Sequence, residues 1–220
     1  MTSQQLADRN LPALSLNDTM RHALNLMQEH TCTHLPIVED NKYKGLIEKN
    51  VLLNYEDTDL LIREVADELK PAAVNGSSHF LKAVPIARLF HTNVIPVINE
   101  ENEYLGSIMY FDLINALGNF SGAGEYGALI VLAIPQPKLV FSELNTIMES
   151  DGATILHYNV SPIAASSVME VTIGLDKKEI STIIASLERY NYKILFTSGD
   201  DLIESQLEDN YNNLMNYLDI

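Results

Sequence analysis

One pattern of apolar and polar positions occurs twice in the first 120 residues. The tetrapeptide Leu-Pro-Ile-Val at residues 35–38 is matched by Ile-Pro-Val-Ile at residues 95–98, and Ala23 is matched by Ala83. After each tetrapeptide, a polar turn leads to a glycine, Gly45 in the first copy and Gly106 in the second. A repeated unit of this length predicts two similar small domains, which we place at residues 1–62 and 63–120.

Each copy is expected to form a short strand, a helix, a strand, a turn, a second strand and a second helix. The apolar stripes of the two first helices are Met20, Leu24 and Met27, and then Phe80, Val84, Ala87, Leu89 and Phe90. The pairs Asn-Asp at residues 17–18 and Ser-Ser at residues 77–78 are expected to cap these helices. Pro85 should kink the second helix or delay its start, because proline has no backbone N–H to donate.

The second half of the chain has a different pattern. Residues 119–126 are small and flexible, so we interpret them as a linker and residues 127–199 as a further domain. Strands are expected at residues 128–134, 154–160, 168–175 and 192–197, with a loop at residues 161–162. The expected helices carry Leu139, Val140, Leu144, Ile147 and Met148, and then Ile180, Ile183, Ile184 and Leu187 after a cap at Asp176. The order βαββαβ predicts a ferredoxin-like fold, with two helices on one face of an antiparallel sheet.

The last segment, residues 200–220, contains six acidic side chains and no basic one. Its apolar residues recur near helical spacing: Leu202, Ile203, Leu207, Tyr211, Leu214, Met215 and Leu218. This pattern predicts an acidic amphipathic helix that packs on its own chain or on a neighbouring one. A regulatory partner site is the alternative.

Composition narrows the possible partners. The chain has 30 acidic and 14 basic residues, a formal charge of −16, so its field repels nucleic acids and anionic membrane surfaces. Its longest aliphatic run, residues 128–134, is too short to span a membrane. A single cysteine, Cys32, cannot form an internal disulfide, and residues 1–10 do not resemble a secretion signal. We therefore expect a cytoplasmic protein with no nucleic-acid or membrane role.

The repeated helix, the proline-containing strand, the turn and the following glycine resemble a tandem pair of cystathionine-β-synthase (CBS) domains, a Bateman module, over about residues 10–120. The resemblance implies a regulatory module with two clefts that often bind adenine nucleotides or S-adenosylmethionine. It also implies that two modules pair, so we expect a homodimer. The mixed α/β (α+β) fold class is then a CBS pair, a ferredoxin-like domain and a C-terminal helix.

The resemblance also implies where a nucleotide would bind. The family's site ends in Gly, two apolar positions, Ser or Thr, two free positions and Asp, whose carboxylate accepts the ribose hydroxyls. In the second copy Gly106 begins this motif and Asp112 ends it, but Met109 replaces the hydroxyl residue. The cleft expected around this motif is formed by Asn75, Ser77, Asn93, Val94, Ile95, Pro96, Met109 and Asp112. Asp112 is equally suited to a structural role, because acidic residues stabilise helix N-termini.

The first copy lacks this chemistry. Val51 stands where the ribose carboxylate should be and Glu48 where the phosphate would lie, so this cleft is unsuited to a nucleotide. We interpret Glu48 and the adjacent Lys49 as solvated surface. The alternation of His30, Cys32 and His34 suggests a zinc site, but no fourth ligand with suitable spacing lies nearby, so we expect capping and packing roles.

The βαββαβ segment resembles an ACT domain, a module that pairs its sheet with another copy and binds amino acids at the interface. The expected ligand loop, residues 135–138, lacks the glycine that lets backbone amides approach a carboxylate, which favours pairing without ligand. A CBS pair followed by an ACT-like domain is the architecture of acetoin-utilisation regulatory proteins.

Two functional hypotheses follow. The first is a non-catalytic regulatory protein that senses AMP, ATP or S-adenosylmethionine through its CBS pair. The alternative is a ligand-free dimerisation scaffold that presents an acidic surface to a protein partner. We expect no enzyme activity, no metal and no cofactor, because the sequence has no nucleophile elbow, phosphate-binding glycine loop or adequately spaced metal motif.

Overall fold

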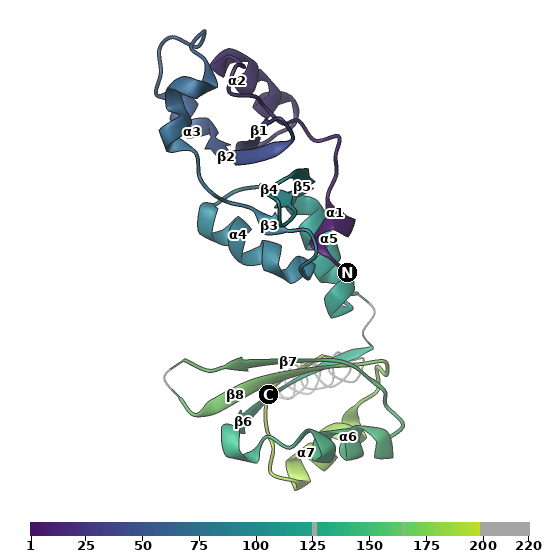
Figure 1. Ribbon diagram of the computed structural model, residues 1–220. Helices are drawn as coiled ribbons and strands as arrows, with labels where there is room; N and C mark the ends of the chain where they lie inside the picture. The colour runs from purple at the N-terminus through teal and green to yellow at the C-terminus, as the bar shows by residue number, and fades with distance from the viewer. Residues whose placement is uncertain (125–126, 165, 199–220) are drawn as a thin grey trace, which may run out of the picture. The chain divides into compact units, whose positions relative to one another are not determined.

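The computed structural model describes residues 1–124, 127–164 and 166–198, and the chain divides into two compact units, residues 1–117 and the part from Gly118 onward (Figure 1). The helix expected at residues 200–220 lies outside the described residues. The boundaries expected at residues 62, 120 and 199 stay predictions. No helix in the described ranges is long and apolar enough to cross a membrane.

The first unit contains the repeated element order predicted from the sequence. The first copy comprises α1 (Ser3–Leu6), α2 (Met20–Glu29), β1 (His34–Glu39), β2 (Lys42–Glu48) and α3 (Lys49–Leu53). The second comprises η1 (Ile62–Glu68), β3 (Val74–Asn75), η2 (Phe80–Lys82), α4 (Ala83–Phe90), β4 (Val94–Ile98), β5 (Tyr104–Met109) and α5 (Tyr110–Ser121). The short first strand is β3 in the second copy, parallel to β4. In the first copy it is reduced to one parallel bridge, between Leu14 and Ile37.

The two copies contact each other through equivalent groups. The Tyr43 N–H donates to the Asn102 carbonyl (3.0 Å), and the Tyr104 N–H donates to the Asn41 carbonyl (2.9 Å). Tyr104 and Asn102 each lie 61 positions after Tyr43 and Asn41, so the two hydrogen bonds are reciprocal. Reciprocal contacts between equivalent residues indicate that the two copies are related by an approximate two-fold axis, as are the two sides of an isologous interface.

The copies also exchange short segments near their starts. Asp8, which follows α1 in the first copy, pairs with Ser107 on β5 of the second through two backbone hydrogen bonds of 2.9 and 3.0 Å. Lys70, which follows η1 in the second copy, pairs with Leu46 on β2 of the first through bonds of 2.8 and 3.0 Å. Each repeat is therefore completed by a segment that belongs, in sequence, to the other.

The two repeated glycines lie directly beneath these exchanged segments. Gly45 and Gly106 have φ angles of +152° and +134°, and each follows an irregularity in strand register at the equivalent place. A Cβ on Gly106 would lie 2.8 Å from the Asp8 carbonyl oxygen, and one on Gly45 would lie 2.7 Å from the Leu69 Cβ. Glycine is needed because both the backbone conformation and the close approach exclude a side chain.

Each copy has its own cluster of buried apolar side chains. The first includes Met20, Ala23, Met27, Ile37 and Ile47, and the second includes Phe80, Ala83, Ala87, Ile95 and Ile108. Val94, on β4 of the second copy, belongs to the cluster of the first, joined by the partly buried Met109. The two copies therefore share packing as well as backbone pairing.

Three local expectations for the first unit need correction or refinement. Thr19 rather than the preceding Asn-Asp pair caps α2, since its hydroxyl accepts from the His22 N–H (3.2 Å). His79 rather than the Ser-Ser pair caps η2. Leu89, expected on the buried stripe, is 71% exposed. The delayed helix start is confirmed, because α4 begins only after η2 and Pro85 lies in its first turn. Backbone N–H groups in the first turn of an α-helix have no acceptor within that helix, so proline is tolerated there.

The second unit has the predicted βαββαβ order, with η3 as an added short turn. Its elements are β6 (Ala128–Pro135), η3 (Gln136–Lys138), α6 (Phe141–Ser150), β7 (Ile155–Pro162), β8 (Val168–Leu175), α7 (Ser181–Arg189) and β9 (Lys193–Ser198). The strands form one antiparallel sheet in the order β7-β8-β6-β9. Helices α6 and α7 lie on the same side of this sheet (Figure 1), and the core lies between them and the sheet. The predicted ferredoxin-like fold is confirmed.

Local details of the second unit differ from the sequence expectations. Helix α5 extends through Ser121, so the expected linker begins within a helix, and β7 includes Pro162 instead of ending before it. Val140 precedes α6 and is exposed. Asp176 does not cap α7, which begins at Ser181, because its carboxylate accepts from the Thr154 N–H (2.7 Å) at the start of the sheet. Each difference shifts an element boundary and leaves the topology unchanged.

Candidate functional site

The residues expected to form the second cleft lie at both ends of β4. Asn75 pairs with Ile98 at the end of β4, whereas Asn93 immediately precedes the start of that strand. Five residues of strand separate these ends by roughly 16 Å. Asn75 and Ser77 also satisfy each other, since the Asn75 side-chain oxygen accepts from the Ser77 N–H and hydroxyl (2.9 and 2.7 Å). The structure therefore does not bring Asn75 and Ser77 together with Asn93.

The apolar members of the expected set serve packing. Val94 and Ile95 are fully or almost fully buried, in the clusters of the first and second copies respectively, and Pro96 is buried on the same strand. Met109 packs against the first cluster at the end of β5. Asp112, by contrast, is exposed on the first turn of α5. Of the expected set, Asn93 and Asp112 are the two polar residues near the start of β4 and α5.

Asn93 connects the two copies. Its side-chain oxygen accepts from the N–H and the hydroxyl of Thr33 (2.8 and 2.9 Å), and its amide group donates to the Thr31 carbonyl (2.8 Å). Thr33 lies 60 positions before Asn93, so equivalent residues of the two copies meet here. A molecule bound at Asn93 would therefore lie where the two copies are joined by hydrogen bonds.

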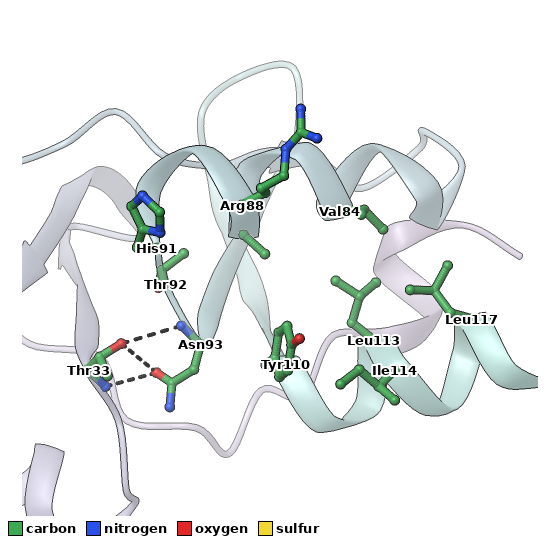
Figure 2. Close-up of a pocket in the computed structure, with 11 residues that line it drawn as sticks. Thr33, Val84, Arg88, His91, Thr92, Asn93, Tyr110, Leu113, Ile114 and Leu117 are labelled. Atoms are coloured by element: carbon green, nitrogen blue, oxygen red, sulfur yellow. Dashed lines mark hydrogen bonds between the residues drawn. The ribbon is translucent and has the colours of Figure 1, made fainter. Parts of the chain in front are cut away.

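A hollow of about 510 Å³ opens beside this junction, between α4 and α5 (Figure 2). Its polar rim includes Thr33, His91 and Asn93. Its remaining walls are mainly apolar: Val84, Ala87, Leu113, Ile114, Leu117 and the ring of Tyr110. Arg88 also borders it, but Figure 2 shows the guanidinium group directed away from Tyr110 and Leu113. The lining suits an apolar or aromatic group held at one end by hydrogen bonds.

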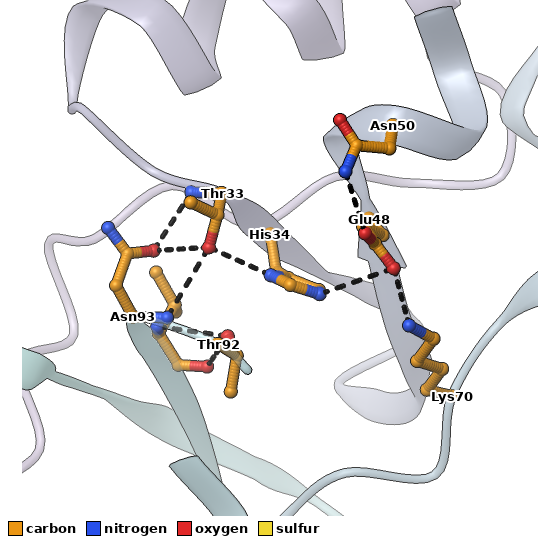
Figure 3. Close-up of polar contacts among 8 residues, drawn as sticks. Thr33, His34, Glu48, Asn50, Lys70, Thr92 and Asn93 are labelled. Atoms are coloured by element: carbon orange, nitrogen blue, oxygen red, sulfur yellow. Dashed lines mark hydrogen bonds and ion pairs between the residues drawn. The ribbon is translucent and has the colours of Figure 1, made fainter. Parts of the chain in front are cut away.

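The corresponding region of the first copy holds a charged cluster (Figure 3). Lys70 forms an ion pair with Glu48, and the Asn50 amide donates to the other Glu48 oxygen (3.0 Å). The Lys70 ammonium and its hydrogen bond lower the pKa of Glu48. The Glu48 side chain is 25% exposed and ion-paired, so it is only partly solvated. Lys70, which lies in the exchanged segment of the second copy, supplies the cation that pairs with Glu48.

His34 lies behind this ion pair and is 2% exposed. The Thr33 hydroxyl donates to Asn93, so the Nδ1 atom of His34, 2.9 Å from that hydroxyl, is the donor to it. Its Nε2 atom then faces Glu48 at 3.8 Å without a hydrogen bond. Burial lowers the pKa of His34 despite the nearby carboxylate, which favours the neutral ring. His34 therefore lies between Asn93, which it reaches through the Thr33 hydroxyl, and the Glu48 and Lys70 pair, which it faces without a hydrogen bond.

Sequence reasoning missed the exchanged segments. Lys70 lies 22 positions from Glu48, and Asp8 lies 99 positions from Ser107, so no local motif connects them. The repeat itself was the available signal, because residues 8 and 70 lie near the starts of the two copies and pair with equivalent positions of β5 and β2. In the described ranges, no group of three or more His, Cys, Asp or Glu side chains is placed to hold a metal ion. Cys32 and His34 are buried within the first copy.

The loop after β6 in the second unit borders a smaller hollow of about 360 Å³. Its walls include Pro135, Lys138 and Glu143. The Tyr192 hydroxyl donates to Glu143 (2.6 Å), and burial, followed by this contact, raises the pKa of Tyr192. The loop forms the short helix η3 and contains no glycine.

The fold and these contacts define a class of protein: a pair of segment-exchanged α/β repeats joined in one chain to a ferredoxin-like unit. Residues 4–56 match the family model for the CBS domain. The CBS resemblance predicted from the sequence is confirmed by this match, which covers most of the first repeat.

Solved structures provide further matches. A CBS domain pair/ACT domain protein from Thermotoga maritima is 19% identical, with 55% of this chain and 98% of that chain covered and a TM-score of 0.49. A proposed acetoin utilization protein (AcuB) from Vibrio cholerae is 18% identical, with 56% and 93% covered and a TM-score of 0.46. CBSX2 in complex with AMP is 17% identical, with 55% and 98% covered and a TM-score of 0.44.

Proposed function

We propose that this is a non-catalytic regulatory protein whose paired repeats bind an adenosine-containing ligand, AMP, ATP or S-adenosylmethionine, beside Asn93 and Asp112. The observation that carries the proposal is the Asn93 junction, where a side chain at the edge of a hollow holds both repeats. Ligand contact there would bias the relative position of the repeats, because the same amide group bonds the ligand and the other repeat. The Tyr110 ring offers a face on which an adenine can stack.

The second copy is favoured over the first for two reasons. Asp112 provides a free carboxylate on the first turn of α5, where ribose hydroxyls find an acceptor, whereas Val51 stands at that position in the first copy. The Lys70 and Glu48 ion pair already occupies the first copy's polar region. We therefore expect one ligand per chain.

Replacing Asp112 with alanine is expected to reduce stabilisation by the ligand. The lost ribose contacts involve a charged acceptor, and such hydrogen bonds contribute roughly 1.5–3 kcal/mol, so affinity should fall by about tenfold to a hundredfold. Thermal unfolding in the presence of each of the three compounds measures the effect.

Asp67→Ala is the matched control, because Asp67 is an exposed acidic residue of the same unit away from the hollow. It removes the same charge, so it should retain the full ligand-induced rise in Tm. An equal response from the wild type, Asp112→Ala and Asp67→Ala would contradict the assignment of Asp112.

A second candidate function is dimerisation, favoured by an apolar face along α4 and α5. Leu89 and Phe111 are 71% and 70% exposed, and neither lines the hollow. Exposed apolar groups gathered on two neighbouring helices indicate an interaction surface. We propose that a second copy of the chain covers this face, as the pairing implied by the CBS resemblance requires.

Introducing glutamate at Leu89 and Phe111 together is expected to separate the dimer. Two carboxylates would be buried without partners, which costs several kcal/mol and should weaken the dimer at least about a hundredfold. Sedimentation measures the dissociation constant. Leu53→Glu, at an exposed leucine on α3 outside this face, should leave it unchanged. If only Leu53→Glu separates the copies, the interface lies elsewhere; a monomeric wild type would exclude the dimer.

A further inference from the structure

The sheet of the second unit is covered by helices on one face only. Along β6, alternate residues are buried against α6 and α7, while Leu129, Val131 and Ala133 point to the other face and are partly exposed. Phe196 on β9 pairs with Val131 and is 54% exposed, and Leu195 beside it is 44% exposed. We call this surface the open face. Its apolar character is unusual for a sheet face left in water.

The open face also contains a hollow with two lysines. The hollow, of about 460 Å³, is lined by Ala133, Val168 and Leu195, with Lys138 and Lys193 at its border. Lys193 pairs with Ala133 across the strands, so it points to the open face. Neither lysine has a carboxylate within ion-pair distance among the described residues. Glu170 on β8 is the acidic residue on this face, since its strand partner Ala133 belongs to it.

We propose that the acidic segment at residues 200–220 covers the open face of its own chain. The segment begins two residues after Ser198, which pairs with Leu129 at the edge of this face. Its apolar residues recur at helical spacing and its six carboxylates have no basic neighbour in the segment. Apolar side chains would bury Val131 and Phe196, and carboxylates would approach Lys138 and Lys193.

The dimensions fit this occupant. A helix of 21 residues is about 30 Å long, and the eight residues of β6 extend about 25 Å. The connection after β9 leaves at the Leu129 end, whereas Lys193 lies at the other end of β9. A segment that turns back after β9 therefore runs along the whole open face toward the two lysines.

Cross-linking of paired cysteines in the full-length protein tests the proposal. Thr172 on β8 faces Val131 across the strands and therefore lies on the open face, whereas Thr182 is exposed on α7 at the opposite face. Each is replaced by cysteine together with Leu207→Cys or Tyr211→Cys in the acidic segment, and a short bismaleimide is added. Cys32 is buried and serves as the unreactive background in all variants.

Links within one chain are expected at Thr172→Cys with a yield at least about tenfold that at Thr182→Cys, because tethering gives millimolar effective concentrations at the covered face only. Adding Lys138→Glu and Lys193→Glu should lower the yield, and Lys178→Glu, at an exposed lysine elsewhere, should not. Links between chains would show that a second copy occupies the face. Equal yields at Thr172 and Thr182, or none at Thr172, would also overturn the proposal.

Discussion

Replacing Gly106 with alanine is expected to lower the free energy of unfolding of the first unit by about 2–4 kcal/mol. The φ angle of +134° disfavours any residue with a Cβ, and that Cβ would lie 2.8 Å from the Asp8 carbonyl oxygen. The clash falls on backbone, so relief requires the exchanged segment to move. Movement would break the two hydrogen bonds between Asp8 and Ser107. Urea denaturation followed by circular dichroism measures the loss.

Gly118→Ala is the matched control for this prediction. Gly118 lies within α5, and a Cβ there would meet no atom within 4 Å. Alanine is the better helix former, so this variant should be unchanged or more stable by up to about 1 kcal/mol. If Gly106→Ala were as stable as Gly118→Ala, the exchanged segment would not be held against β5 as the structure shows.

Replacing Leu132 with alanine is expected to destabilise the second unit by about 2–5 kcal/mol, the second large effect. Leu132 lies in the middle of the central strand β6 and is fully buried against the helices. Truncation leaves a cavity that the flanking strands β8 and β9 prevent from closing. Its cluster shares no member with the two clusters of the first unit, so the unfolding of that unit should be unaffected.

Calorimetry resolves this prediction if each unit unfolds in its own transition. Leu132→Ala should lower one transition, and Ile95→Ala, a buried residue of the second copy, should lower the other. If both variants lower a single shared transition, the two units unfold cooperatively and the separate-core interpretation is wrong.

The topology could be predicted from the sequence because periodicity and repetition are local signals. The two Pro-containing strands, the two glycines and the alternation along residues 168–175 each mark an element within a few positions. Element ends were less predictable, since neighbouring polar residues compete for the same role. Asp18 illustrates this competition, because its carboxylate accepts from the Ser15 N–H (2.7 Å) and leaves Thr19 to cap α2.

The candidate site was only partly predictable, because its partners are distant in sequence. Asn93 and Asp112 could be named from a motif, but Thr33 reaches Asn93, and Lys70 reaches Glu48, only after the two copies have folded together. Strand β3 runs parallel to β4 and pairs with its C-terminal end, so Asn75 lies far from Asn93, which precedes the start of β4. The sequence does not show which end of β4 the strand β3 pairs with. The repeat shows which residues of the two copies are equivalent, but only the approximate two-fold packing of the copies determines which of these residues come into contact.

Calorimetric titration of the full-length protein with AMP, ATP and S-adenosylmethionine tests the proposed function most directly. The account predicts saturable heat from at least one of the three compounds, with one molecule bound per chain, because the second copy alone retains the ribose carboxylate. Two molecules per chain would contradict the expectation that the first copy is unsuited to a nucleotide. No heat from any compound at any temperature tried would contradict the proposal that the paired repeats sense an adenosine-containing ligand.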